Sequence, residues 1–238
     1  MTKALFREDA YLASCEARVV AINERGGIVL DQTVFYPVGG GQPGDQGVLE
    51  WDGQTCEIAV AVKGDAVGEV VHVPAPEQPV PAVGSTVKAS LNWDVRYRYM
   101  RVHTALHLLS VVIPLPVTGG SIGAEKGRLD FDMPDAPADK EALQAELNAL
   151  IQADHPVTDE WITDDELEAK PDMVKTMSVK PPMGQGHVRL VRIGGEDPVD
   201  LQPCGGTHVR STAEIGPVRI GKVEKKGKQN RRVSILID

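Results

Sequence analysis

Two histidines and a later Cys/His pair are the residues whose spacing could hold a metal ion. His103 and His107 stand four residues apart in an apolar stretch with helical periodicity, so on a helix both imidazoles lie on one face. Cys204 and His208 belong to the segment Pro-Cys-Gly-Gly-Thr-His, where two glycines favour a turn. Together the pairs offer four ligands of the kinds that tetrahedral Zn²⁺ takes. The pattern predicts one zinc ion per chain.

Two other interpretations of these residues stay open. Histidines on partly apolar helices are often ordinary core or surface residues, and Cys204 could be a nucleophilic thiolate with His208 as its base. The helix has no glutamate beside His103, which separates it from the His-Glu-x-x-His proteases. Three of the six histidines and one of the three cysteines fall in the two pairs. This concentration favours a shared metal.

Length and composition limit the class of protein. A chain of 238 residues can form one large domain or two small ones. No apolar run reaches membrane-spanning length, and the charged first ten residues do not resemble a signal peptide. The three cysteines are odd in number and widely spaced, which argues against a disulfide framework and predicts a reducing, cytoplasmic location. Nothing in the composition indicates an obligate protein partner or a membrane.

The charge of the chain is negative overall but unevenly distributed. A net charge of −9 is unfavourable for a general nucleic-acid binder. Residues 130–172 carry 14 acidic and 2 basic residues, whereas residues 209–238 carry 8 basic and 3 acidic residues. The basic segment could therefore hold a polyanion locally. The alternative is that each charged run is simply a solvated face.

Residues 1–92 have the pattern of an all-β domain. Short apolar stretches separated by Gly/Pro turns are typical of a small barrel. Gly39, Gly41 and Gly44 formally match the dinucleotide-binding motif, but Pro43 and the strand-like residues that follow exclude the helix which that motif requires. The stretch is either a plain hairpin turn or a turn whose bare backbone lets a substrate approach.

Residues 93–238 mix helices and strands without a repeating βαβ pattern, so the whole chain is predicted to be α+β. A helix over residues 92–113 carries the two histidines, and residues 117–123 are expected to be a loop. Further helices are predicted over 138–153 and 163–169, the second with a Thr-x-x-Glu capping pattern. Strands are predicted over 128–132, 156–161 and 187–193, with a closing hairpin over 215–226 and 231–237.

These motifs resemble a known family. The segment from Arg101 to Leu109, together with Cys204-Gly-Gly-Thr-His208, is similar to the editing domain shared by alanyl-tRNA synthetase and the free-standing alanyl-tRNA editing (AlaX) proteins. Phe35-Tyr-Pro37 leading into Gly39-Gly-Gly-Gln-Pro43 resembles the glycine motif of the longer AlaX proteins, which carry an N-terminal barrel. No aminoacylation domain is evident. The resemblance therefore indicates the free-standing form, with a barrel over 1–92 and an editing domain over 93–238.

The resemblance implies a reaction, a cofactor and a partner. The reaction is hydrolysis of the ester that joins serine or glycine to the tRNA for alanine, with zinc held by His103, His107, Cys204 and His208. The nucleophile is expected to be a water bound to or beside the zinc, and no side chain stands out as its base. If all four protein ligands bind, zinc has no open position unless one ligand leaves or the coordination expands.

Two further sets of residues are assigned as expectations. The resemblance implies that serine is sorted from alanine by residues of the barrel, namely Thr33, Gly39, Gly40, Gly41 and Gln42. The basic segment can be placed against tRNA phosphates through Lys222, Lys225, Lys226, Lys228, Arg231 and Arg232. The alternative to an enzyme is a zinc-stabilised tRNA-binding module without catalysis.

Overall fold

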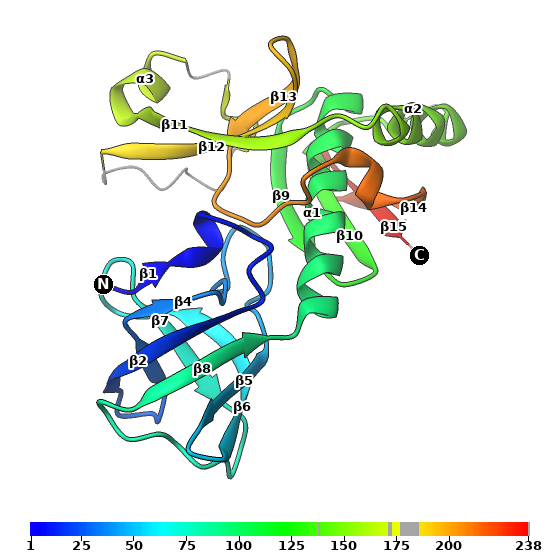
Figure 1. Ribbon diagram of the computed structural model, residues 1–238. Coiled ribbons are helices and arrows are strands. Elements are labelled where there is room, and N and C mark those ends of the chain that lie inside the picture. Colours follow the sequence, from blue (N-terminus) through cyan, green and yellow to red (C-terminus); the bar gives the residue numbers. More distant parts are fainter. Residues whose placement is uncertain (138, 171–172, 177–185, 238) are drawn as a thin grey trace. The chain divides into compact units, whose positions relative to one another are not determined.

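The computed structural model describes residues 1–137, 139–170, 173–176 and 186–237. The chain divides into two compact units, Met1–Tyr97 and Arg98–Asp238, and the division falls inside helix α1 (Trp93–Val112). The units contain a closed barrel, two further multi-stranded sheets and few helices (Figure 1). The predicted α+β class is confirmed. No helix in the described part of the chain is long and apolar enough to cross a membrane.

The first unit is a closed six-stranded barrel, as the sequence predicted. The strands follow the order β2-β3-β7-β6-β5-β8, and a short parallel pair, β1 and β4, lies outside it. The elements are β1 (Lys3–Ala4), η1 (Leu5–Arg7), β2 (Ser14–Ile22), β3 (Ile28–Leu30), β4 (Gln32–Thr33), β5 (Gly47–Trp51), β6 (Gln54–Lys63), β7 (Val70–Pro74) and β8 (Thr86–Leu91).

Apolar side chains on alternate residues fill the barrel. In β8 Val87, Ala89 and Leu91 are buried while Thr86 and Lys88 are exposed, which is the period-two pattern of a strand with one face on a core. Their neighbours in the core include Leu30, Phe35, Leu49 and Ile58. Closing the sheet on itself leaves no unpaired edge in this barrel.

The glycine-rich stretch forms a tight hairpin turn. Gly39 and Gln42 exchange backbone hydrogen bonds of 3.1 and 2.9 Å, and the two residues between them, Gly40 and Gly41, have φ of 58° and 82°. Two consecutive positive φ values are typical of a type I′ turn, which favours glycine at both positions. Strand β5 follows this turn, so the motif does not open a helix and the predicted glycine-rich hairpin turn is confirmed.

A buried ion pair holds the end of this stretch. Arg96 and Asp45 are 0% and 1% exposed, and Arg96 Nε lies 2.9 and 3.0 Å from the two Asp45 carboxylate oxygens. The same guanidinium donates to the carbonyls of Val34 and Ala10 at 2.8 and 3.0 Å, while Asp45 accepts the backbone N–H of Tyr36 at 2.6 Å. These bonds compensate for the removal of both charges from water.

The second unit contains two sheets and the helices α1, α2 and α3. One sheet has the order β14-β15-β10-β9 and the other β11-β12-β13, and all their pairings are antiparallel. Their strands are β9 (Val117–Ile122), β10 (Lys126–Asp132), β11 (Val157–Thr163), β12 (His187–Gly194), β13 (Pro198–Pro203), β14 (Val218–Lys226) and β15 (Asn230–Ile237). The other elements are α2 (Lys140–Gln152), α3 (Asp164–Glu168) and η3 (Thr212–Ile215).

Helix α1 lies across the four-stranded sheet (Figure 1). A Cβ added to Gly127 of β10 would come within 2.5 Å of Val102 and 3.1 Å of Leu106, so the glycine permits the close approach of helix and strand. This packing buries the apolar residues of the helix and fixes the rotation of the helix about its own axis. His103 and His107 each come one residue after these two contacts, so their side chains lie about 100° around the helix from the face that meets β10.

The two smaller helices begin with the caps that their sequences provide. Asp139 accepts the N–H of Ala142 at 2.8 Å at the start of α2, and Thr163 forms a complete capping box with Glu166 at the start of α3. The Thr-x-x-Glu prediction is confirmed. The predicted first residue of the longer helix, residue 138, lies outside the described residues.

Three segments differ from the sequence-based expectation. Residues 117–123 were predicted to be a loop, but Val117–Ile122 form strand β9, which pairs with β10. Its glycines are tolerated because β9 lies at the edge of the sheet. Strand β13, Pro198–Pro203, was not predicted, since prolines at both ends obscure it. Residues 212–215, expected in part to open the closing hairpin, form the short helix η3, and β14 begins at Val218.

Candidate metal centre

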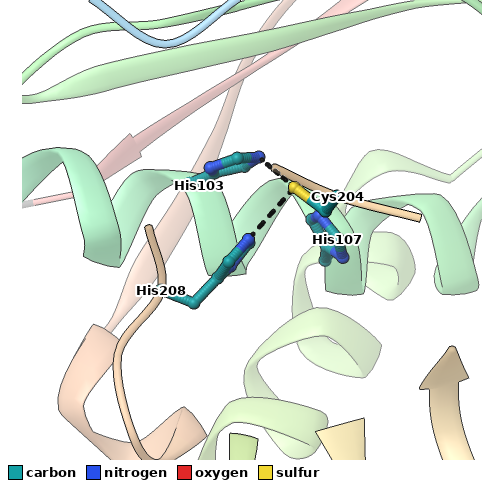
Figure 2. Close-up of side chains that lie close together, drawn as sticks. All are labelled: His103, His107, Cys204 and His208. Atoms are coloured by element: carbon teal, nitrogen blue, oxygen red, sulfur yellow. Dashed lines mark hydrogen bonds between the residues drawn. The ribbon is translucent and has the colours of Figure 1, made fainter. Parts of the chain in front are cut away.

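The structure brings the two Cys/His pairs together in the second unit. His103 and His107 project from one face of α1, and Cys204 and His208 come from the turn that follows β13 (Figure 2). One ligand atom from each residue lies within 4.8 Å of every other. Three of the side chains are buried and Cys204 is half-buried. Among the described residues, these four side chains form a group of metal-type donors that lie close enough together to share one ion.

The distances within the group fit a tetrahedral ion. Cys204 Sγ lies 3.5 Å from His103 Nε2 and 3.3 Å from His208 Nε2. Tetrahedral zinc with ordinary bond lengths keeps a sulfur and a nitrogen ligand about 3.5 Å apart. One thiolate and three imidazoles also form a donor set that zinc accepts. The residues therefore fit a zinc ion, both in spacing and in chemistry.

Two of the histidines are held by partners outside the group. His107 Nδ1 lies 2.9 Å from the Asp200 carboxylate, so its Nε2 is left for the cluster. His208 Nδ1 lies 3.1 Å from the Thr104 hydroxyl, which leaves Nε2 toward Cys204. Metal-binding histidines in proteins usually have a second hydrogen bond of this kind on the ring nitrogen that does not bind.

The buried Asp200 is the centre of a polar network. Its carboxylate accepts from Lys175 Nζ at 2.6 Å and from Gln202 Nε2 at 2.7 Å, besides the contact with His107. Burial would raise the pKa of Asp200, but the His107 and Lys175 contacts prevail and lower it to about 2. Asp200 is therefore ionised at neutral pH and can accept a hydrogen bond from the imidazole.

The protonation states within the group follow from its close contacts. Burial opposes the thiolate, but His103 and His208 lower the pKa of Cys204 well below that of a free thiol. Burial lowers the pKa of His208, and neighbouring His103 lowers it further. Burial also works against a charged His107, yet hydrogen bonds to Asp200 and Cys204 raise its pKa to about 9 in the metal-free protein. The shifts favour a thiolate at Cys204 and a neutral imidazole at His208, both of which suit a bound cation.

Arg189 on β12 holds the turn that carries the thiol. Its Nη1 donates to the carbonyls of Cys204 and Gly206 at 3.1 and 3.0 Å, and its own carbonyl accepts the Cys204 N–H at 3.1 Å. The Gly206 N–H points back to Cys204 Sγ at 3.4 Å. The side chain of Cys204 is therefore oriented by a strand and its own turn.

The residues predicted for selectivity lie in the barrel unit. Thr33 is fully buried, and its hydroxyl lies 2.8 Å from His72 Nε2 and accepts the Phe35 N–H at 3.0 Å. Gln42 is also buried, whereas Gly40 and Gly41 at the tip of the turn are exposed and Gly39 is half-buried. The carbonyl of Gly39 accepts the Tyr36 hydroxyl at 2.9 Å.

The residues predicted to bind tRNA lie on the β14–β15 hairpin. Its four lysines, Lys222, Lys225, Lys226 and Lys228, are exposed, and Lys222 lies 3.5 Å from Glu224. The two arginines are half-buried. Arg232 makes a two-pronged pair with Asp130 at 2.7 and 2.8 Å, and Arg231 donates to the carbonyl of Pro134. The lysines are therefore the more accessible cations of this surface.

Sequence reasoning missed the partners that orient the histidines. Asp200 and Gln202 alternate with Val199 and Leu201 along β13, yet the polar residues are the buried ones. An ordinary strand of this pattern would turn its apolar side chains inward. The sequence therefore predicts that Val199 and Leu201 are the buried residues, whereas Asp200 and Gln202 are. Thr104 lies inside the recognised helical motif and carries no distinguishing signal of its own.

Comparison with known proteins gives the class to which this fold and site belong. Residues 188–234 match the family model described as the threonyl and alanyl tRNA synthetase second additional domain, and residues 6–95 match that of class II (A) tRNA synthetases. The chain is thus built from segments related to aminoacyl-tRNA synthetases, and it has the Cys/His pair of the turn within the region of the second domain.

Individual relatives narrow the class to one family. The chain is 36% identical to the alanyl-tRNA editing protein AlaX-M of Methanosarcina mazei, over 98% of this chain and 95% of that protein. It is 33% identical to AlaX-L of Pyrococcus horikoshii, over 98% of this chain and 57% of that protein. Alanine–tRNA ligase of Pyrobaculum neutrophilum is 39% identical across 94% of this chain, which spans 25% of the ligase. The chain belongs to the alanyl-tRNA editing (AlaX) protein family.

Proposed function

We propose that the protein is a free-standing, zinc-dependent hydrolase that removes serine or glycine from wrongly charged tRNA for alanine. The observation that carries this proposal is the convergence of four metal-type donors in a chain that matches AlaX-M over nearly its whole length. His103, His107, Cys204 and His208 would hold the zinc. Bound there, zinc would supply a Lewis acid to a reaction that cleaves an already activated ester.

The chain's own residues would prepare the site for this reaction. Asp200 and Thr104 orient His107 and His208, and Arg189 holds the Cys204 turn. Their hydrogen bonds fix the donor atoms before any ligand arrives, which reduces the cost of organising the site. Water is the nucleophile in this proposal, and no side chain is assigned as its base.

Thr33 is proposed to favour serine over alanine. Ile28 can offer only its carbonyl to His72 Nδ1, 3.1 Å away, so this nitrogen carries the proton and His72 Nε2 accepts. The Thr33 proton therefore goes to His72, while Thr33 Oγ1 already accepts the Phe35 N–H. One lone pair remains on Oγ1, which suits the hydroxyl of serine and has no counterpart in alanine. Gly40 and Gly41 are proposed to assist at the exposed tip of the turn, which Gly39 and Gln42 close through their backbone hydrogen bonds.

The exposed lysines of the β14–β15 hairpin are proposed to bind tRNA phosphates. Lys222, Lys225, Lys226 and Lys228 contribute positive charge in the accessible position that phosphate binding needs. Arg231 and Arg232 belong to the same surface. Arg232 already forms an ion pair with Asp130, so it would have to contact a phosphate and Asp130 together. The free thiols of Cys15, Cys56 and Cys204 support the expectation of a reducing, cytoplasmic location.

The decisive experiment is release of serine from seryl-tRNA for alanine by zinc-loaded protein at low enzyme concentration. Alanyl-tRNA for alanine runs in parallel, and glycyl-tRNA tests the second substrate. We expect fast loss of serine with alanine retained. If folded, zinc-loaded protein binds the tRNA but leaves both esters at the uncatalysed rate, the protein is the non-catalytic zinc module instead. Inactivation by thiol alkylation in protein that never held zinc would favour the cysteine hydrolase.

A further inference from the structure

The hydroxyl of Thr104 has three polar neighbours, and chemistry assigns a role to each. Thr104 donates its single proton to the carbonyl of Met100, one turn earlier in α1, at 3.0 Å. The backbone N–H of Val209 donates to Thr104 Oγ1 at 3.3 Å. A hydroxyl has one proton and two acceptor positions. One acceptor position is therefore left, and His208 Nδ1 lies 3.1 Å away.

These roles determine where the proton of His208 must lie. Since Thr104 has no proton left to give, its contact with His208 is a hydrogen bond only if Nδ1 carries the hydrogen and donates it. In a neutral imidazole the lone pair then lies on Nε2. Nε2 is the atom that lies 3.3 Å from Cys204 Sγ. The tautomer that Thr104 requires is therefore the one that can bind a metal within the cluster.

Asp200 makes the corresponding contact with the second histidine. Its carboxylate can only accept when ionised, so His107 Nδ1 donates across their 2.9 Å contact and Nε2 faces the cluster. The two partners come from different places: Thr104 from α1, Asp200 from β13. Both are buried, so water does not compete for the ring protons. The packing of α1 against β13 and the Cys204 turn thus decides that Nδ1 of each histidine is used outside the cluster and that Nε2 faces it.

We propose that Thr104 is a positioning residue that holds His208 in the tautomer whose Nε2 binds the metal, as Asp200 does for His107. The proposal rests on the metal site of the proposed function and is independent of the deacylation reaction. Thr104 and His107 are three residues apart on α1, so one turn of helix provides both a ligand and the partner of another ligand. The bond to Met100 is essential, because it removes the only proton with which Thr104 could favour the opposite tautomer.

The first test reads the tautomer directly in the metal-free protein. Long-range ¹H–¹⁵N correlation spectra of imidazole-labelled protein at neutral pH distinguish a protonated Nδ1 from a protonated Nε2. His208→Ala identifies the signals. We expect protonated Nδ1 on His208 in the native protein and in Thr104→Ser, which retains the hydroxyl. A native His208 whose Nδ1 carries no proton would overturn the proposal without any variant.

The second test measures zinc affinity by competition with a chromophoric chelator. Thr104→Val keeps the volume of the side chain but removes the acceptor, and we expect about 10- to 100-fold weaker zinc binding. Thr104→Ser should restore most of the affinity. Ser234→Ala removes another buried hydroxyl, one with no hydrogen-bond partner in the described structure, and should bind zinc like the native chain. Equal affinity in Thr104→Val and Ser234→Ala would contradict the proposal.

Failure of the proposal is distinguishable from failure of the metal site. If the native protein binds no zinc, the metal site is wrong, while the spectrum of metal-free His208 still decides the tautomer. If Thr104→Val does not fold, Thr104→Ala and Thr104→Ser repeat the comparison in a smaller and a hydroxyl-bearing side chain. If the zinc affinity of the variants depends on the size of the side chain at position 104 and not on the presence of a hydroxyl, Thr104 is only a packing residue.

Discussion

The hydroxyl of Thr33 lies 2.8 Å from Nε2 of His72 inside the barrel, and both residues are completely buried. This contact connects the residue proposed for selectivity with a neutral histidine. Thr33→Val should leave His72 Nε2 without its donor and the Phe35 N–H without its acceptor, which costs about 1–3 kcal/mol of unfolding free energy per group. The same variant should narrow the ratio of kcat/KM for serine and alanine esters.

Thr33→Ser is the matched control because it keeps the hydroxyl. Urea unfolding and single-turnover hydrolysis of both charged tRNAs measure the two effects separately. A destabilised Thr33→Val with an unaltered serine-to-alanine ratio would show that the hydroxyl serves the barrel alone.

The burial of His72 predicts a pH-dependent stability. Burial lowers its pKa from 6.5 to about 4, despite the opposing hydrogen bond to Ile28. The unfolded chain therefore takes up the proton at a higher pH than the folded chain does. The free energy of unfolding falls as the pH decreases from about 6.5 to about 4. Below about pH 4, His72 causes no further change. The shift corresponds to about 3 kcal/mol. Urea unfolding of metal-free protein at a series of pH values should show this component, and His72→Gln should lack it.

The thiol of Cys204 should be required for zinc and for turnover together. Cys204→Ala removes the sulfur that lies 3.3–3.5 Å from two imidazoles, so zinc content measured by mass spectrometry and serine release should fall in parallel. Cys15→Ala, which changes a half-buried thiol in the barrel, should alter neither. If Cys204→Ala retains both its zinc content and its turnover, Cys204 is not a ligand of the metal centre.

The exposed lysines of the β14–β15 hairpin should contribute to tRNA affinity through charge. Replacing Lys225 and Lys226 by Gln should weaken binding and reduce the slope of log K against log[salt] by about 1 for each phosphate that is no longer neutralised. Lys3→Gln with Lys88→Gln changes the net charge equally, but in the first unit of the chain. Fluorescence anisotropy at several salt concentrations measures the slope. The hairpin has no special role if both double variants behave alike.

The buried pair of Arg96 and Asp45 should dominate the stability of the barrel unit. Arg96→Met would leave the Asp45 carboxylate and the carbonyls of Val34 and Ala10 without their donor, at a cost of about 3–5 kcal/mol. Arg98→Met, two residues along the same helix, breaks an exposed pair with Glu125 and should cost less than about 1 kcal/mol. Equal urea midpoints for the two variants would contradict this.

The parts of the site that depend on local spacing were evident from the sequence. The pair His103 and His107 needs only helical periodicity to share a face, and Cys204 with His208 needs only a turn that two glycines allow. The alternation of apolar residues with Gly/Pro turns likewise predicted the barrel, because a strand with one buried face has period two. Each of these signals is contained within a few consecutive residues.

The tertiary structure alone decided what surrounds those residues. Asp200 faces inward on β13 against its own apolar pattern, Thr104 meets His208 from a distant segment, and Arg232 pairs with Asp130 across two strands. Such contacts arise when packing brings separate segments together, and a buried polar group must then find whatever partner the fold provides. The sequence determined which atoms could bind a metal, and packing determined which nitrogen of His107 and His208 is left to bind it.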